Sequence, residues 1–312
     1  MKKIVTCLVD SIDYVNKNCY QHQLSSVLEK EFDVRYVDLS DLEVFKASND
    51  SIILSRLKLR TLTSKANQLA NAISNCKNIF IYEQDPWENF IIGSKCNGTY
   101  KKVTSLLPHA VFLNTSLWWS DLVKMQGCKS TFVQMWMIPE YCIKPIQWEH
   151  RKYDVAFCGT LYPRRQKFFS ALESAGIKVE ILSPNKNYHQ YLELVASCKI
   201  MLRSEVVDWV IEHPVKGRCD VTEPNALWIR DVECSARGCY TMRNYDEEMN
   251  VWNLNKVTAV KPFYDVNDAV KIATNILSYS SEQAMNELKQ SSDFIKQSRG
   301  WHTICDVINE II

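Results

Sequence analysis

Residues 153–172 read YDVAFCGTLYPRRQKFFSAL and contain a complete strand–turn–helix pattern. The apolar run 153–158 predicts a buried strand, and Gly159 and Thr160 predict the turn after it. Pro163 suits the first turn of a helix, which we expect to begin close to it. A strand followed directly by a helix is the repeating unit of a parallel α/β sheet.

The same alternation of short apolar runs and helical patterns extends in both directions along the chain. Before the quoted segment, strands are expected at 4–9, 34–39, 51–54, 78–82, 110–113 and 131–135. After it, strands are expected at 179–182, 199–202, 239–242 and 256–260. Strands separated by helices pair in parallel, because the connection must cross over the sheet. We therefore predict an α/β fold with two Rossmann-like doubly wound domains facing across a cleft.

The segment 138–152 (IPEYCIKPIQWEHRK) interrupts this rhythm with two prolines and mixed charge. We therefore predict an N-terminal domain, a linker and a C-terminal domain over residues 1–143, 144–152 and 153–312. The final helix, from about Trp301, is free to pack back on the N-terminal domain. The segment 206–224 lacks a clear pattern and is expected to be a surface loop. The loop after the first strand has no glycine, which argues against a dinucleotide site, and no phosphate-binding GxxxxGK[ST] motif occurs.

Composition narrows the class of protein further. The 312 residues are 46% hydrophobic and 23% charged, as in a globular protein, and a net charge of +1 gives no support to dedicated nucleic-acid binding. The 12 cysteines are scattered without a CxxC pair, so we expect reduced thiols. We find no signal-peptide pattern and no run of ~20 apolar residues. These features predict a cytoplasmic protein without a membrane span.

Two arginines, Arg164 and Arg165, stand at the start of the helix in the quoted segment. Backbone N–H groups, the positive end of the helix dipole and two guanidinium groups would converge there. This combination favours a bound phosphate. The alternative is a solvated arginine pair in a first helical turn.

A second informative segment, residues 225–242, reads NALWIRDVECSARGCYTM. On a helix, Arg230 and Glu233 are three residues apart and share a face. A carboxylate such as Glu233 can accept both hydroxyls of a ribose, while Arg230 can neutralise a departing diphosphate. The alternative is an intrahelical ion pair, which contributes little to stability.

Together the two segments resemble the nucleotide-sugar-binding domain of glycosyltransferases with the GT-B fold. They are most similar to the spore-maturation-protein-type (CgeB-like) branch of the group 1 glycosyltransferases. In that branch a Gly-Ser/Thr turn precedes an arginine pair, and a later glutamate precedes a glycine by five residues, as Glu233 precedes Gly238 here. The likeness covers roughly residues 150–312. One departure is Asn225, where retaining members often place a second glutamate, although Glu223 lies nearby.

The resemblance implies an enzyme that transfers a hexose or pentose from a nucleotide diphosphate sugar to an acceptor hydroxyl. The N-terminal domain would bind the acceptor and the C-terminal domain the donor. It implies no cofactor and no metal: no Asp-x-Asp triplet occurs, and arginines would stabilise the leaving phosphate. The donor-binding residues that it implies are Gly159, Thr160, Arg164, Arg165, Arg203, Arg230 and Glu233.

An inverting glycosyltransferase also needs a base that deprotonates the acceptor hydroxyl. Asp85, in IYEQDPWENF, follows the fourth predicted strand, and Asp10 follows the first. Both would lie at the carboxyl ends of parallel strands, which makes them the candidate catalytic residues. The alternative is that such an aspartate caps a helix or forms a turn. Trp87 is placed either to stack on a sugar ring or to pack in the core.

The donor sugar, the nucleotide base, the stereochemistry and the acceptor stay open. Acceptors compatible with this fold include a glycan, a lipid-linked glycan, a protein and modified DNA. Two alternative functions also remain, a nucleotide-sugar epimerase and a non-catalytic two-lobed protein that binds a sugar or nucleotide. Catalytic turnover separates the second alternative from a glycosyltransferase.

Overall fold

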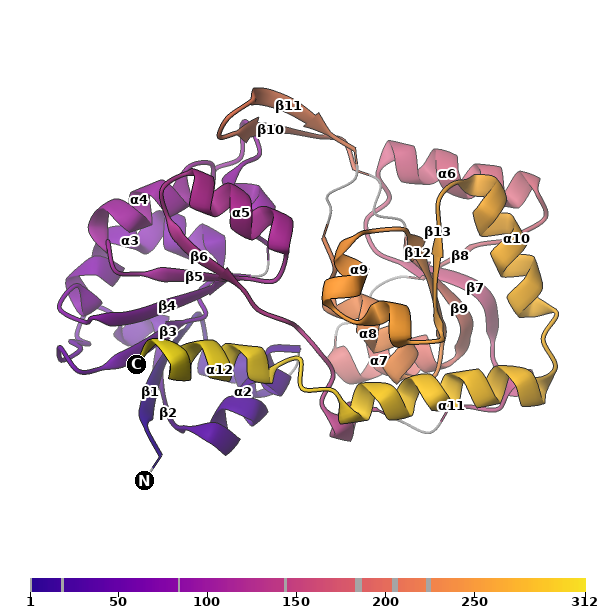
Figure 1. Cartoon of the computed structure of the whole chain (residues 1–312), viewed down its shortest axis with the longest axis horizontal. Coiled ribbons are helices and arrows are strands. Elements are labelled where there is room, and N and C mark those ends of the chain that lie inside the picture. Colours follow the sequence, from indigo (N-terminus) through magenta and orange to yellow (C-terminus); the bar gives the residue numbers. More distant parts are fainter. Residues whose placement is uncertain are drawn as a thin grey trace. The chain divides into compact units, whose positions relative to one another are not determined.

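The computed structural model describes residues 2–17, 20–83, 85–142, 145–182, 187–203, 207–222 and 226–312. The chain forms two compact units, which are described separately (Figure 1). Unit 1 comprises Met1–Gln134, Trp209–Val221 and Trp301–Ile312, and unit 2 comprises Met135–Asp208 and Thr222–Gly300. This division groups residues by their contacts and does not test where the predicted domains begin and end. The predicted end of the N-terminal domain at residue 143 and the predicted start of the C-terminal domain at residue 153 therefore stay predictions.

Unit 1 is built on a six-stranded parallel sheet with the order β2-β1-β3-β4-β5-β6. Its strands are β1 (Ile4–Val9), β2 (Asp33–Asp38), β3 (Ile52–Ser55), β4 (Asn78–Glu83), β5 (Val111–Asn114) and β6 (Lys129–Phe132). The central strands β1, β3 and β4 are buried along almost their whole length, as expected for a parallel sheet covered on both faces. The strand order reverses between β1 and β3, which makes this the topological switch point of unit 1.

Helices cover both faces of the unit 1 sheet. On one face lie α2 (Tyr20–Glu31), which follows α1 (Ile12–Lys17), and the C-terminal α12 (His302–Ile311). On the other face lie α3 (Leu59–Ile73), α4 (Thr99–Leu106) and α5 (Leu117–Met125) (Figure 1). Short 3-10 helices, η1 (Leu39–Asp41) and η2 (Pro86–Asn89), complete the connections. Ser116 caps α5, because its hydroxyl accepts the N–H of Trp119 at 3.2 Å.

Unit 1 also contains a two-stranded antiparallel hairpin from the second half of the chain. It consists of β10 (Trp209–His213) and β11 (Gly217–Val221). The expectation of a surface loop over 206–224 is therefore wrong for residues 209–221. The hairpin pairs through its backbone with residues 90–92, a long-range contact that leaves no local sequence pattern.

Unit 2 is built on a five-stranded parallel sheet with the order β13-β12-β9-β7-β8. Its strands are β7 (Tyr153–Cys158), β8 (Glu180–Leu182), β9 (Cys198–Arg203), β12 (Tyr240–Asn244) and β13 (Val260–Phe263). The strand order reverses between β7 and β9, so the switch point of unit 2 lies at the end of the strand that opens the sequence pattern quoted above. The last strand begins four residues later than expected, because η5 (Leu254–Lys256) occupies the start of the predicted range.

The helices of unit 2 again lie on both faces of the sheet. On one face are α6 (Pro163–Ser174) and α10 (Val266–Leu277), and on the other are α7 (Tyr188–Ala196), α8 (Ile229–Ala236) and α11 (Ser281–Gln297). The shorter helices are η3 (Pro139–Tyr141), η4 (Trp148–His150) and α9 (Glu248–Val251). Gly238 ends α8 with φ +75°, and a Cβ there would lie 2.7 Å from Pro145 Cβ, so only glycine fits.

Candidate functional site

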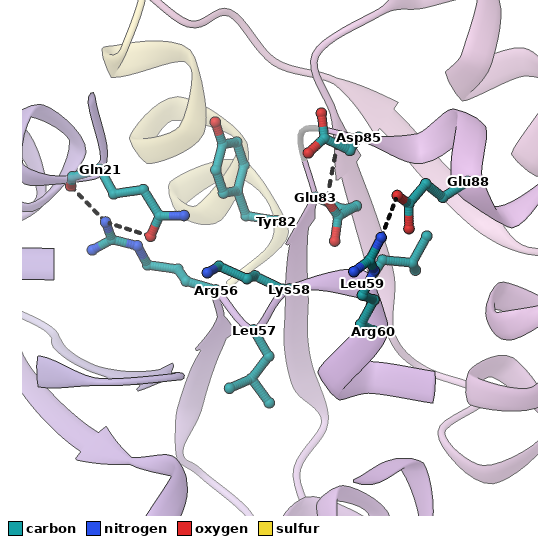
Figure 2. Close-up of a pocket in the computed structure, with 10 residues that line it drawn as sticks. All are labelled: Gln21, Arg56, Leu57, Lys58, Leu59, Arg60, Tyr82, Glu83, Asp85 and Glu88. Carbon is teal, nitrogen blue, oxygen red and sulfur yellow. Dashed lines mark hydrogen bonds and ion pairs between the residues drawn. The ribbon is translucent and has the colours of Figure 1, made fainter. Parts of the chain in front are cut away.

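Unit 1 contains a pocket of about 250 Å³ at the carboxyl ends of β3 and β4 (Figure 2). Its lining comes from the first turn after β3, from the end of β4 and the turn after it, and from α2: residues 56–60, Tyr82, Glu83, Asp85, Glu88 and Gln21. The loops at the carboxyl ends of parallel strands are where α/β sheets bind ligands. The volume is slightly below the roughly 300–1,000 Å³ that is typical of small-molecule sites.

Asp85 lines this pocket directly before η2. Its backbone N–H donates to Glu83 Oε1 at 2.9 Å, so the buried Glu83 fixes the backbone of Asp85 (Figure 2). The Asp85 side chain makes no capping hydrogen bond to η2. The capping alternative considered from the sequence is therefore not what this side chain does.

Asp10 has a different environment at the end of β1. Its carboxylate accepts the backbone N–H of Lys58 at 2.9 Å and the hydroxyl of Thr61 at 2.5 Å. These bonds anchor the first turn of α3 to β1. Asp10 is not among the residues that line the pocket. Of the two predicted base candidates, Asp85 thus lines this pocket, whereas Asp10 bonds to the backbone of Lys58.

Arg56, which sequence reasoning missed, lies in the same pocket and is only 2% exposed. It donates to the hydroxyl of Ser25 at 2.8 Å. It also donates to the carbonyl of Gln21 at 2.5 Å, as Figure 2 shows. These partners are neutral, so among the residues that the structure describes these hydrogen bonds of the buried guanidinium go to uncharged groups. Its place directly after the SIILS strand was the available signal, since that position opens on the ligand-binding edge of the sheet.

Trp87 packs inside unit 1 and is 7% exposed. Its ring stacks on Trp209 of β10 with centroids 5.7 Å apart and meets the edge of Trp119 at 6.4 Å. Of the two roles considered from the sequence, the structure therefore favours core packing over stacking on a sugar.

In unit 2, the Gly159–Thr160 turn after β7 contacts two side chains, those of Phe157 and Arg165. A Cβ on Gly159 would lie 2.9 Å from the Phe157 ring, so the turn approaches that ring too closely for a larger residue. The buried Arg165 donates to the carbonyl of Thr160, and its guanidinium lies 5.0 Å from the centre of the Phe157 ring. Arg164, by contrast, is half exposed and forms an ion pair with Asp208. The two arginines of the pair therefore have different roles.

Arg230 and Glu233 both project from α8 but contact different groups. Arg230 donates through Nη1 to the carbonyl of Cys158 at 3.1 Å, which places it at the carboxyl end of β7 beside the Gly159 turn. Glu233 is 1% exposed and accepts the hydroxyl of Tyr188. Burial raises the pKa of Glu233 above its ordinary value, against the opposing effect of the Tyr188 hydrogen bond. The two side chains thus do not form the intrahelical ion pair that was the alternative.

Arg203 ends β9 and belongs to a buried network of charges. Its Nε lies 3.8 Å from Asp231, whose other carboxylate oxygen pairs with Arg243 at 2.8 Å. Arg243 also lies 3.6 Å from Asp246. Asp231, Arg243 and Asp246 were missed from the sequence. The available signal was Arg243 itself, a charged residue in the otherwise uncharged strand YTMRN.

The structure therefore gathers most of the predicted donor residues at one edge of unit 2. Gly159, Thr160, Arg165 and Arg230 surround the end of β7, and Arg203 ends the adjacent β9, across the switch point. The predicted positions Glu223 and Asn225 lie outside the described residues. Within the described ranges, no helix has the length and apolar composition needed to cross a bilayer.

Sequence comparisons match one short segment of the chain. No protein-family model matches the chain. The chain is 38% identical to "Uncharacterized protein L140" of Acanthamoeba polyphaga mimivirus over 52 residues, which is 17% of each protein. The match therefore spans less than a fifth of that relative.

Solved structures match nearly the whole chain. An alpha-glucosyltransferase in complex with UDP and a 13-mer DNA containing a HMU base has a TM-score of 0.54, with 10% identity over 99% of both chains. HepE from Anabaena in complex with UDP and glucose has a TM-score of 0.59, with 9% identity over 99% of both. Sucrose-phosphate synthase from Thermosynechococcus elongatus has a TM-score of 0.55, with 10% identity over 99% of this chain and 98% of that one. At these identities the likeness concerns the fold, and it confirms the predicted class: two Rossmann-like α/β units, as in GT-B glycosyltransferases.

Proposed function

We propose that the chain is a glycosyltransferase that moves a sugar from a nucleotide diphosphate sugar to an acceptor hydroxyl. The main support is the set of arginines at the switch point of unit 2, where Arg230 reaches the carbonyl that ends β7 and Arg203 ends β9. Guanidinium groups beside strand ends can stabilise a departing diphosphate through their positive charge and their hydrogen bonds to its oxygens. Placement in the CgeB-like branch belongs to this proposal and rests on the sequence resemblance.

The donor binds in unit 2. Arg230, Arg203 and Arg165 supply positive charge near the Gly159 turn, while Glu233 is the proposed partner of the ribose hydroxyls. Because Tyr188 donates to Glu233, a ribose hydroxyl would have to replace the tyrosine as the donor to this carboxylate. We propose uridine diphosphate as the nucleotide, since it is the one named with the alpha-glucosyltransferase and with HepE.

The acceptor binds in the unit 1 pocket, with Asp85 as the base if the reaction inverts the anomeric centre. The carboxylate takes the proton of the acceptor hydroxyl, whose oxygen bonds to the anomeric carbon as the bond from that carbon to the diphosphate breaks. The pocket is lined by the carboxylates of Glu83, Asp85 and Glu88 and by the cations of residues 56, 58 and 60. This mixture suits a hydroxyl-rich acceptor, because each hydroxyl both donates and accepts a hydrogen bond.

Two further parts of the proposal concern the need for a metal and the cellular location of the reaction. The reaction proceeds without a metal, since arginines take the role of neutralising the leaving diphosphate. We also expect it to take place in the cytoplasm. Among the acceptors open from the sequence, the DNA in one neighbour's structure makes modified DNA worth testing beside glycans.

The test is turnover of UDP-sugars with EDTA present, measured as release of UDP, with and without a panel of glycans and hydroxymethylated DNA. We expect acceptor-dependent UDP release and a product larger than the acceptor by one sugar. Loss of activity in EDTA that returns with Mg²⁺ would contradict metal independence. Tight UDP binding without turnover on any acceptor would favour a non-catalytic sugar- or nucleotide-binding protein.

A further inference from the structure

We propose that the β10–β11 hairpin positions the rim of the unit 1 pocket, and that Trp209 is its main positioning residue. We use the term rim for the segment 85–94, which begins with Asp85, contains η2 and contributes Asp85 and Glu88 to the pocket lining. This inference rests on the proposed function, because it gives Asp85 a catalytic role. It adds a group of residues, far away in the sequence, that no sequence pattern connects with the pocket.

The hairpin extends the rim through its backbone. The N–H of Ile92 donates to the carbonyl of Val210 at 2.9 Å, and the N–H of Glu212 donates to the carbonyl of Phe90 at 2.8 Å. Between these bonds, the side chain of Ile211 is 1% exposed. Reciprocal backbone bonds around a buried side chain fix both the direction and the register of the two segments.

Trp209 contacts the rim at the point closest to the proposed chemistry. Its ring stacks on Trp87 at an interplanar angle of 15°. Trp87 lies between Asp85 and Glu88 in the sequence, and both of these acidic residues line the pocket. Trp209 therefore packs on Trp87 of η2, the short helix that contributes Glu88 to the pocket lining.

The middle of the rim is fixed by the start of α4. The Asn89 side chain accepts the N–H of Tyr100 at 2.8 Å, and the Asn89 carbonyl accepts the N–H of Gly98 at 3.0 Å. These contacts are local in sequence and do not involve Trp87. Removing the Trp209 ring would therefore leave the Asn89 contacts in place and remove the stacking contact that supports Trp87. Asp85 would keep its backbone bond to Glu83, but the segment between Asp85 and Glu88 would lose one of the two rings packed on Trp87.

The position of the hairpin in the sequence links the proposed donor residues with the proposed acceptor pocket. The hairpin lies in sequence between β9, which ends at Arg203, and α8, which carries Arg230 and Glu233. The segment of chain that carries the proposed donor residues thus also contributes a support for the proposed acceptor pocket. A separate acceptor domain formed only from the N-terminal half of the chain would lack this support.

The test compares Trp209→Ala with Trp209→Phe and with Val215→Ala, a control at the hairpin tip where the side chain is 76% exposed. Turnover is normalised to the number of UDP-binding sites, so that unfolded protein does not count. We expect Trp209→Ala to lower kcat by about 10- to 100-fold, the scale expected for a misplaced catalytic group. The UDP Kd should stay within about twofold, because Trp209 is not one of the residues proposed to bind the donor. Trp209→Phe should recover most of the rate, and Val215→Ala should match the wild type.

Amide hydrogen exchange gives a second readout that needs no activity. In Trp209→Ala the N–H of Ile92 should exchange faster than in the wild type, whereas Val215→Ala should leave it protected. An unchanged exchange rate, or faster exchange with an unchanged kcat, would overturn the positioning role. A fully active Asp85→Asn variant would instead refute Asp85 as the base, and the Trp209 variants would still decide whether the hairpin supports the pocket.

Discussion

At the carboxyl end of the unit 1 sheet, three carboxylates line a pocket, whereas the corresponding edge of unit 2 is dominated by arginines. In unit 1 these carboxylates are Glu83, Asp85 and Glu88. In unit 2, Arg230 and Arg203 lie near the ends of β7 and β9. The two sheets share one topology around their switch points, so the difference lies in the residues that the loops carry. Carboxylates can take a proton and guanidiniums can stabilise an anion, so the proposed function assigns the acceptor half of the reaction to unit 1 and the donor half to unit 2.

The largest expected effect comes from the carboxylate in the unit 1 pocket. Asp85→Asn should lower kcat by ~10²–10⁴-fold, the usual contribution of a general base, with little change in UDP affinity. The matched variant is Asp10→Asn, which weakens the anchor to Lys58 and Thr61 and should cost about 1 kcal/mol of unfolding free energy. Steady-state kinetics and urea unfolding measure both. Equal losses of kcat in the two variants would remove the distinction between Asp85 and Asp10.

The next effect concerns the arginines of unit 2. Arg230→Ala should lower kcat/KM by ~10²–10³-fold, because it removes a cation placed for the leaving diphosphate. Arg164→Ala should change it by less than about fivefold, because a half-exposed ion pair with Asp208 contributes at most ~1 kcal/mol. Kinetics with a saturating acceptor check both values. If Arg164→Ala proved as damaging as Arg230→Ala, the diphosphate would have to be placed at the start of α6 instead.

The smallest effect is a pH dependence of stability that belongs to unit 2. Because burial raises the pKa of Glu233 above its ordinary value of 4.5, the folded protein binds this proton more tightly than the unfolded chain does. The resulting stabilisation is complete below the ordinary pKa and is lost as the pH rises through the raised pKa. The wild type should therefore lose stability relative to Glu233→Gln when the pH is raised from a value below 4.5 to a value above it.

Urea unfolding of the two proteins at both pH values measures this loss, and Tyr188→Phe sharpens it. The Tyr188 hydrogen bond lowers the pKa of Glu233, so removing the hydroxyl should make the loss on raising the pH larger. A stability difference between wild type and Glu233→Gln that does not change with pH would show that Glu233 titrates normally.

Much of the fold could be predicted from the sequence, because parallel strands buried on both faces are short continuous apolar runs. Ile4–Val9 and Asn78–Glu83 are such runs, and both are strands. The hairpin at 209–221 could not be predicted in this way, since its stability comes from residues 90–92 and Trp87. The helix Ser281–Gln297 was missed because its surface is polar, although Ala284, Leu288 and Ile295 are buried at helical spacing.

The sequence predicted which loops and helix faces carry the candidate site residues, but it did not predict the contacts of their side chains. The positions of Asp85 and Arg230 follow from strand ends and a helix face, which local patterns reveal. The different roles of Arg164 and Arg165 depend on which way two long side chains turn. The burial of Arg56 likewise depends on Gln21 and Ser25, which come from a distant helix. Pairings between distant segments have no signature in one sequence.

The central claim is that the donor binds in unit 2 and the acceptor in unit 1. Its most direct test is a calorimetric titration of UDP, in EDTA, into the wild type, Arg230→Ala and Asp85→Asn. The account predicts that Arg230→Ala binds UDP at least about tenfold more weakly, a loss of roughly 1.4 kcal/mol, while Asp85→Asn binds it like the wild type. Equal affinity in all three proteins, or a loss confined to Asp85→Asn, would contradict the placement of the donor in unit 2.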